Sequence, residues 1–570
     1  MKIRSIIIAI GALTFVYSNS AVDTTKSLTS RVADVVYYPI AALKESIRQK
    51  YPVVQALPEA PIKVRIGQDI CQQEVAFLEN RRPKAQQALK DYFGIDTSLK
   101  IGIACTGGGN RAMLASLGFL LGAQEIGLFD AAYYMVGLSG STWTISPFSY
   151  LHATQGMTLT QFKDQLMPRL GSLMKIVVSG AAPVPVFSSY QTASMQDNFA
   201  KRYGYDQYLS SIDIYAAFIG NFTLLPAGKN RLDVTWSSIA DTIKEGNIPL
   251  PLGSTVAYKK THKDGTQYYW LEVSPFEVGS DQLQGYVPVK AFGSKFKNGI
   301  TLPDYQGHAP EYPISFYEAV FGSAFTVSVN EIVDRYVTYS FKVLGQKITL
   351  PLKQMFSSHL AEYTRFSPAT FHNFTFGLPG NPMEKDEKIK LYDAAMNFNM
   401  PLPIVMRPAR QVDLVFVCDA SIDSDSLKFA QNHFKRHKIK FPDMSLLKQS
   451  MIAKPLTIFN DPRLATYDKN MVTIAYCPFV KNEAFSKTFD PIVCQAKDVC
   501  NTFNFNYTQA QAEQVVGLSR YNLVSMKDEI KDVLQALQQQ KTQIAVQKEK
   551  LTADVVKLNQ MLTEEVQIVV

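Results

Sequence analysis

The chain has 570 residues, of which 46% are apolar and 19% charged, so it can bury a large core and wholesale disorder is excluded. Its formal net charge of +8 comes from scattered lysines and arginines, and nothing indicates nucleic-acid binding. Six cysteines are too few for a disulfide scaffold, and no Cys/His pattern has the spacing of a zinc site. Cys494 and Cys500 could close a small loop in an oxidising compartment, whereas Cys105 and Cys418 lie in apolar runs typical of buried thiols.

The N-terminus has the organisation of a secretory signal peptide. A basic start at residues 1–4 precedes an apolar run at residues 6–16, and small residues at 18–21 offer a cleavage site. We therefore expect a signal peptide at residues 1–20 and a secreted or periplasmic protein that can associate with membranes. An uncleaved N-terminal anchor is the alternative interpretation.

The turn after the first strand-like run has two interpretations. An apolar run from Lys100 ends in the turn Thr106–Arg111, whose consecutive glycines leave backbone N–H groups open, and a helix-compatible stretch follows. Gly107–Ala112 also fits the relaxed G-x-G-x-x-A dinucleotide pattern, which is weak by itself. The dinucleotide interpretation requires an acidic residue at the end of the next strand to hold the ribose.

The next strand ends in a serine where that acid would be needed. The run Tyr133–Val136 continues directly into the turn Gly137–Gly140, which carries Ser139. The turn lacks the second glycine of the usual G-x-S-x-G elbow, but it follows the glycine-rich turn by one strand. A nucleophile beside a site for the oxyanion it creates is what acyl transfer requires. The two turns together favour a serine esterase, and we expect no cofactor and no metal.

The rest of the chain indicates an α/β protein. Roughly between residues 155 and 370 the pattern is irregular and rich in aromatics, prolines and glycines, and we interpret it as lid insertions on one domain. Strand-like runs return at Ile404–Met406, Leu414–Cys418 and Val472–Ala475. Apolar runs that alternate with helices are typical of a mostly parallel sheet covered on both faces.

Apolar residues recur every seven positions near the C-terminus. This spacing predicts a long helix with coiled-coil character, although Lys541 and Lys548 interrupt the companion row of the repeat. Two interpretations stay open: a coiled coil that self-associates, or a helix folded back on its own domain. The row consists of Ile530, Leu537, Ile544, Leu551 and Leu558.

A serine nucleophile needs a base, and no histidine has the expected position. None of the seven lies in a strand-end turn of the kind that presents a catalytic histidine, and His433 and His437 fall on a lysine-rich helix, where we expect them to be solvated. We therefore favour a carboxylate, Asp393, as the base. The alternatives are a turn-capping role for Asp393 and a catalytic role for Asp419.

These stretches resemble the catalytic domain shared by cytosolic (group IV) phospholipase A2 and the fungal phospholipase B/lysophospholipases. That family carries S-G-G-G-x-R-A-M, then G-L-S-G-S-x-W, then D-x-G/A-x-x-x-N-x-P followed by R-P. The corresponding stretches, in the same order, are Thr106–Met113, Gly137–Trp143, Asp393–Pro401 and Arg407-Pro408. With further similar stretches, the resemblance covers roughly residues 60–537.

The resemblance implies a patatin-like α/β fold of the cytosolic phospholipase A2 type. This fold is a three-layer sandwich with a mostly parallel central sheet, lid insertions and a long C-terminal helix. It places the catalytic domain at residues 63–537, after a lead-in at residues 21–62. Residues 538–570 would form the coiled-coil-like helix.

By the same resemblance, Ser139 is the nucleophile and Asp393 the general base of a catalytic dyad without histidine. Gly108 and Gly109 would donate the oxyanion hole, and Arg111 would bind the lipid phosphate. The implied activity is hydrolysis of fatty-acyl esters of glycerophospholipids or lysophospholipids at a membrane or micelle surface. The rival hypotheses are a Ser-His-Asp carboxylesterase and a non-catalytic lipid-binding surface protein.

Overall fold

The computed structural model describes residues 61–170, 211–302, 309–323 and 369–568, apart from short gaps, together with residues 198, 202 and 205–208. The expected signal peptide and nearly all of the lead-in lie outside the described residues. Within the described ranges, no helix combines the length and the apolar character that a membrane span requires.

The central sheet is parallel in its middle and antiparallel at its flanks. Its strands follow the order β1-β7-β6-β5-β4-β3-β2-β12-β14-β13, and the hairpin β10-β11 joins it through β4. The neighbours β4-β3-β2-β12-β14 are parallel, and the remaining pairs are antiparallel. The expected α/β class with a parallel central sheet is therefore confirmed. The strands are β1 (Arg65–Ile66), β2 (Ile101–Cys105), β3 (Ala132–Leu138), β4 (Leu250–Thr261), β5 (Gly265–Val273), β6 (Glu277–Ser280), β7 (Gly285–Pro288), β10 (Ala369–His372), β11 (Lys388–Asp393), β12 (Leu414–Asp419), β13 (Thr457–Phe459) and β14 (Thr473–Pro478), with β8 (Phe296–Lys297) and β9 (Ile300–Thr301) in a separate small hairpin.

Helices pack against both faces of the sheet. The main helices are α3 (Gln72–Phe93), α4 (Gly109–Glu125), α5 (Leu128–Ala131), α6 (Thr142–Gln155), α7 (Leu159–Leu166), α10 (Ser211–Thr223), α11 (Ala240–Lys244), α12 (Ile314–Phe321), α16 (Leu402–Val405), α17 (Asp425–Arg436), α19 (Pro491–Ala496), α20 (Gln509–Val524) and α21 (Lys527–Ile568). On β12, the Cys418 thiol faces α4. Val415, three residues away, points to the opposite face of the sheet, where Val405 of α16 also lies. Strands between two helical layers explain why every residue of β2, β3, β12 and β14 is buried.

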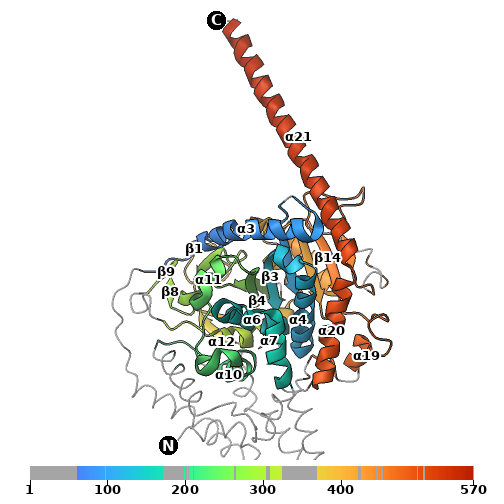
Figure 1. The fold of residues 1–570 in the computed structure, drawn as a ribbon. Helices are drawn as coiled ribbons and strands as arrows, with labels where there is room; N and C mark the ends of the chain where they lie inside the picture. Colours follow the sequence, from blue (N-terminus) through green and yellow to red (C-terminus); the bar gives the residue numbers. More distant parts are fainter. Residues whose placement is uncertain are drawn as a thin grey trace, which may run out of the picture.

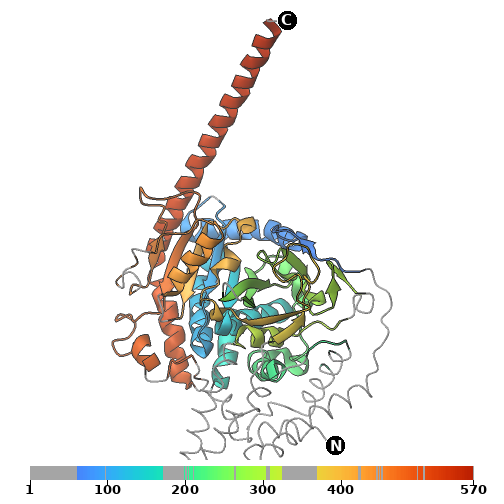
Figure 2. The same ribbon diagram turned by 180° about the vertical axis from the view of Figure 1, so that it is seen from behind.

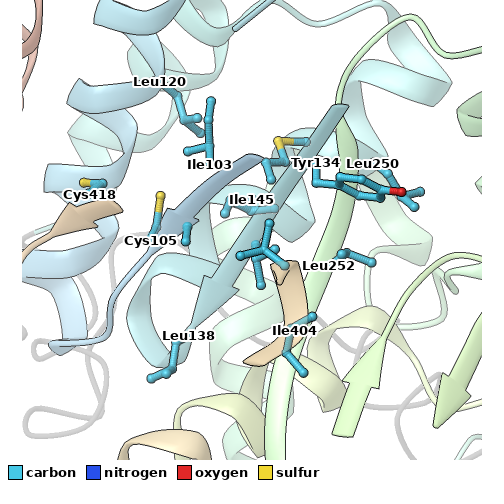
Figure 3. Packing of buried hydrophobic residues seen from close by; sticks show 14 of the residues in the cluster. Ile103, Cys105, Leu120, Tyr134, Leu138, Ile145, Leu250, Leu252, Ile404 and Cys418 are labelled. Carbon is cyan, nitrogen blue, oxygen red and sulfur yellow. The ribbon is translucent and has the colours of Figure 1, made fainter. Parts of the chain in front are cut away.

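The core sits where the parallel strands meet these helices. Figure 3 shows Leu120 of α4, Ile145 of α6 and Ile404 of α16 around side chains of the central strands. The thiols of Cys105 and Cys418 belong to this core and are buried, as expected. Cys494 and Cys500 form a disulfide, with Cα atoms 5.2 Å apart.

Two expectations about the middle of the chain were wrong. The run Ile404–Met406 lies at the end and C-cap of the helix α16 and is not a strand, because Pro401 and Pro403 cannot donate to a ladder but suit a first helical turn. Part of the region expected to form lid insertions, residues 250–288, contributes β4 to β7 of the central sheet. Pro251 and Gly253 within β4 obscured its strand pattern.

The C-terminal helix α21 has two parts. Ile530, Leu534 and Leu537 are buried, and Lys541 Nζ lies 2.7 Å from Asp413 Oδ2, so the first turns pack on the domain. Residues 551–556 are exposed, and the helix projects away from the rest of the protein there (Figures 1 and 2). The folded-back interpretation therefore describes the first part of the helix.

Candidate active site

The glycine-rich turn joins β2 to the N-terminus of α4. Gly108 is the N-cap of this helix, with φ 144°, and Gly109 begins it with φ 60°, both in the left-handed region that glycine favours. In the described part of the chain, no group accepts a hydrogen bond from the Gly108 or Gly109 N–H. Since the partial positive charge of a helix N-terminus adds to these donors, the turn can stabilise an oxyanion.

Ser139 sits on a strained turn between β3 and α6. Its φ is +53°, which is uncommon for a residue with a side chain and is typical of a nucleophile held at a sharp strand-to-helix bend. Its side chain is 8% exposed, which leaves a small opening to solvent. Ser141 holds the bend, since its Oγ accepts a hydrogen bond from the Leu138 N–H and lies 2.9 Å from the Cys105 carbonyl oxygen.

The two turns lie close together because each has a glycine at the contact. A Cβ on Gly107 would lie 2.7 Å from the Ser139 Cβ, and a Cβ on Gly140 would lie 2.0 Å from the Gly109 carbonyl oxygen. Distances this short cannot be relieved where the neighbour is backbone. The glycines therefore bring the open N–H groups against the serine turn.

Asp393 approaches the serine turn on a strand that runs antiparallel to β4. It is the last residue of β11, which runs antiparallel to β4 and pairs Asp393 with Thr255. β3 pairs Leu138 with Ser254, the preceding residue of β4. Since β5 occupies the other edge of β4 here, β3 and β11 lie end to end on one edge, and their C-terminal ends meet. The fold thus brings the serine turn and the end of β11, which carries Asp393, to the same edge of β4.

The surroundings of Asp393 fix its backbone and part of its side chain. The carboxylate is fully buried, and Oδ1 accepts a hydrogen bond of 2.9 Å from the Ala395 N–H. Its own N–H donates to Ser323 Oγ at 3.0 Å. The capping role that the sequence left as an alternative is therefore present, and it occurs on the residue that lies beside the serine turn.

Arg111 is buried in the first turn of α4. Its Nε donates to the Ala420 carbonyl at 2.8 Å and its Nη1 to the Cys500 carbonyl at 2.6 Å. The third nitrogen, Nη2, lies beside Gly108, where a Cβ would be 2.6 Å away. Backbone carbonyls thus bind two of the three guanidinium nitrogens, whereas the sequence interpretation left the whole group free for phosphate. The third nitrogen lies beside the glycine-rich turn.

Asp419 lies at the end of β12 and is fully hydrogen-bonded. Its Oδ1 accepts hydrogen bonds from Thr106 Oγ1 at 3.0 Å and from the Ser421 N–H at 2.8 Å. Its Oδ2 accepts from the Tyr476 hydroxyl at 2.6 Å. Burial raises the pKa of this carboxyl, although these donors oppose the shift. The contacts favour a role in fixing Thr106 and the start of the glycine-rich turn.

Three of the four histidines that the structure describes contact groups outside the two turns. His152 contacts the Met157 carbonyl and His372 the Asp206 carbonyl, while His437 lies 2.8 Å from Gln282. His262, His308 and His359 lie outside the described residues. Within the part of the chain that can be described, no group of three or more His, Cys, Asp or Glu side chains is arranged to hold a metal ion.

Sequence reasoning missed Asn399. Its side chain hydrogen-bonds both backbone groups of Gly107, at 2.8 Å to the N–H and 3.1 Å to the carbonyl. The only signal in the sequence was the fixed spacing of the D-x-G/A-x-x-x-N-x-P motif, to which no role was assigned. The partner of Asn399 lies nearly three hundred residues earlier, and the sequence gives no indication of that pairing.

His433 is packed against aromatic rings and is not solvated as expected. Its ring centroid lies 5.5 Å from that of Phe398 and 6.3 Å from that of Trp270, beside the segment that follows Asp393. Burial, with the nearby charges of His437 and Arg436, lowers the pKa of His433 to about 3. The folded protein therefore keeps this imidazole neutral.

This shift predicts a loss of stability in mild acid. Unfolded histidine titrates near pH 6.5, so below that pH the unfolded chain binds a proton that the folded chain refuses, and the free energy of unfolding falls. We expect the His433 contribution to fall by up to about 2 kcal/mol between pH 7 and pH 5. Urea unfolding of wild type and His433→Gln at both pH values measures it. Equal pH dependence in wild type and His433→Gln would contradict the assignment.

The fold and the site define a family. Residues 101–434, more than half of the chain, match the model of the lysophospholipase catalytic domain, and the chain belongs to this family. The resemblance inferred from the sequence motifs is thereby confirmed. Among solved structures, human GIVD cytosolic phospholipase A2 has the same fold, with a TM-score of 0.66 at 23% identity over 85% of this chain and 69% of that chain.

Individual relatives are cytosolic phospholipases A2. The zeta form of mouse is 24% identical over 557 residues, and the human epsilon form is 24% identical over 562 residues. These alignments cover 83% and 86% of this chain but only 62% and 61% of the relatives. The chain therefore spans less than two thirds of the length of these relatives.

Proposed function

We propose that the protein is a serine acyl hydrolase that releases fatty acids from glycerophospholipids or lysophospholipids. The observation that carries the proposal is the meeting of β3 and β11 on consecutive residues of β4, since the serine turn follows β3, Asp393 ends β11 and the glycine-rich turn contacts the serine turn. Membership of the lysophospholipase catalytic domain family supports the substrate class. The relatives that are phospholipases A2 support it as well.

The proposed reaction has two steps. Asp393 accepts the proton of Ser139 Oγ as this oxygen attacks the ester carbonyl carbon, and the N–H groups of Gly108 and Gly109 stabilise the oxyanion. The oxyanion collapses to acyl-Ser139, and the departing alcohol takes the proton from Asp393. Asp393 then accepts a proton from a water molecule whose oxygen attacks the acyl-Ser139 carbonyl carbon. As this second oxyanion collapses, the bond to Ser139 Oγ breaks, the proton on Asp393 returns to Ser139 Oγ, and the fatty acid is released. Arg111 Nη2 supplies positive charge for the lipid phosphate.

Product analysis with the purified full chain tests the proposal. We expect fatty-acid release from lysophosphatidylcholine or a mixed-acyl phosphatidylcholine in micelles, and covalent labelling of Ser139 by a fluorophosphonate. A structure of human GIVD cytosolic phospholipase A2 in complex with methyl gamma-linolenyl fluorophosphonate makes this probe class a reasonable choice. Absence of both release and labelling would favour a non-catalytic lipid-binding protein.

The Ser-His-Asp alternative makes a different prediction. It requires one histidine whose replacement abolishes release, whereas the dyad requires none. Replacing the seven histidines one at a time therefore separates the two mechanisms. Loss of activity in a single folded histidine variant would reject the dyad.

We also propose that the protein is secreted or periplasmic. The basic start, the apolar run and the small residues at the N-terminus support this location, and the disulfide between Cys494 and Cys500 is compatible with an oxidising compartment. N-terminal sequencing of the protein from its native host should show cleavage near residue 20. An intact Met1 in the native protein would contradict cleavage.

The projecting part of α21 is proposed to pair with a second copy. Val546, Leu551 and Val555 are 59%, 65% and 50% exposed, and the heptad spacing continues through this part. We expect the full chain to sediment as a concentration-dependent oligomer and the double variant Leu551→Lys/Val555→Lys as a monomer. An equal sedimentation mass for the full chain and the double variant would contradict this proposal. The activity per chain should be the same in both proteins.

A further inference from the structure

Asn399 connects the segment that carries the proposed base to the turn that carries the proposed oxyanion donors. Its Oδ1 accepts a hydrogen bond of 2.8 Å from the Gly107 N–H, and its Nδ2 donates one of 3.1 Å to the Gly107 carbonyl. One planar amide thus holds both backbone polar groups of a single glycine. Two hydrogen bonds from one rigid group fix orientation as well as position.

The second of these bonds has a consequence for Gly108. The Gly107 carbonyl and the Gly108 N–H belong to the same peptide unit, which is planar and trans. In such a unit the C=O and N–H bonds point in opposite directions, so a bond that fixes the carbonyl also fixes the N–H. By holding the Gly107 carbonyl, Asn399 determines the direction of the Gly108 N–H.

The turn needs this support because its backbone is permissive. Thr106–Gly109 contains three consecutive glycines, and glycine adopts either sign of φ at little cost. The upstream side is held, since the Thr106 N–H donates to the Cys418 carbonyl at 3.0 Å. Among the described residues, Asn399 is the only side chain that hydrogen-bonds the Gly107 backbone. Without it, no side chain of the described structure would hydrogen-bond the peptide between Gly107 and Gly108.

Asn399 is itself held rigidly. Phe398 packs against Trp270 with ring centroids 4.8 Å apart, and Trp270 Nε1 donates to Asn397 Oδ1 at 2.8 Å. Met400 on the other side is fully buried. The side chain that orients the turn therefore projects from a fixed segment that starts at Asp393.

We propose that Asn399 is a positioning residue that aims the Gly108 N–H at the oxyanion and couples the oxyanion turn to the base segment. The proposal rests on the proposed acyl-hydrolase function. It requires no contact between Asn399 and the substrate. The effect should appear in the rates of acylation and deacylation. The oxyanion forms only in these two steps, so its donors stabilise their transition states and not the bound substrate.

The test compares Asn399→Ala and Asn399→Asp with Asn397→Ala. Removing one oxyanion donor typically costs a factor of about 100 to 1000 in rate, and we expect a misdirected donor to cost roughly 10- to 100-fold in kcat, with KM changed less than threefold. Asn399→Asp is nearly isosteric and keeps the acceptor for the Gly107 N–H but loses the donor to the carbonyl, so it should share the loss. Asn397→Ala loses a hydrogen bond in the same segment and should lower the unfolding temperature while kcat stays within threefold.

Labelling of the wild type by a fluorophosphonate is measured first, and the rate of labelling is then compared across the variants. An unlabelled, inactive wild type would overturn the proposed function and this inference together. A labelled wild type with Asn399→Asp equally fast would overturn only the role of Asn399. Equal loss of kcat in Asn397→Ala and Asn399→Ala would assign the effect to general loosening of the segment and reject the positioning role.

Discussion

Replacing Ser139 by alanine should abolish fatty-acid release, with a loss in kcat on the order of 10⁴-fold or more, because no acyl-enzyme can form without the nucleophile. The substitution removes one oxygen at a site that is 8% exposed, and no stabilising hydrogen bond of the described structure depends on the Ser139 side chain. Alanine also tolerates φ +53° no worse than serine, so the fold should survive. Fatty-acid release from lysophosphatidylcholine and intact mass after fluorophosphonate treatment measure the two effects.

Ser141→Ala is the matched control for this substitution. Ser141 lies in the same turn, and its hydroxyl links the Leu138 N–H to the Cys105 carbonyl, so its loss should destabilise the fold by about 1–3 kcal/mol. Labelling at Ser139 should persist in this variant. Release that survives in Ser139→Ala, or a label found on another serine, would show that the nucleophile has been misassigned.

Local sequence was sufficient to predict the two turns and their strands. β2, β3, β12 and β14 fall where apolar runs indicated them, because strands buried on both faces must be apolar throughout. Glycines that must adopt positive φ or approach another backbone closely leave an equally local signal, which is why Gly108 and Gly109 could be placed at a donor-lined turn.

Contacts between distant segments could not be predicted in this way. The meeting of Asp393 with the serine turn depends on β11 pairing with β4, and β4 itself was hidden because Pro251 and Gly253 interrupt its apolar run. The anchoring of Arg111 by the Ala420 and Cys500 carbonyls is also invisible in the sequence, since a carbonyl acceptor has no residue signature.

The substitution Asp393→Asn should have the second large effect on activity, because it removes the proposed base. The amide keeps the size of the side chain, and its oxygen can still accept the hydrogen bond from the Ala395 N–H, so β11 and the turn after it should retain their structure. An amide cannot take the proton of Ser139 Oγ, and the loss in kcat should be at least about 1000-fold with little change in KM. Because hydroxide would then have to replace the base, the residual rate should rise with pH.

Asp419→Asn discriminates between the two buried carboxylates near the glycine-rich turn. Asp419 accepts hydrogen bonds from Thr106, Ser421 and Tyr476, and an amide at this position would place an NH2 donor against groups that themselves donate. The variant should therefore lose about 1–3 kcal/mol of stability, while each folded molecule keeps far more activity than Asp393→Asn. If Asp419→Asn were instead stable and inactive while Asp393→Asn stayed active, the proton would travel through Asp419, and the meeting of β3 and β11 would serve only to cap the turn.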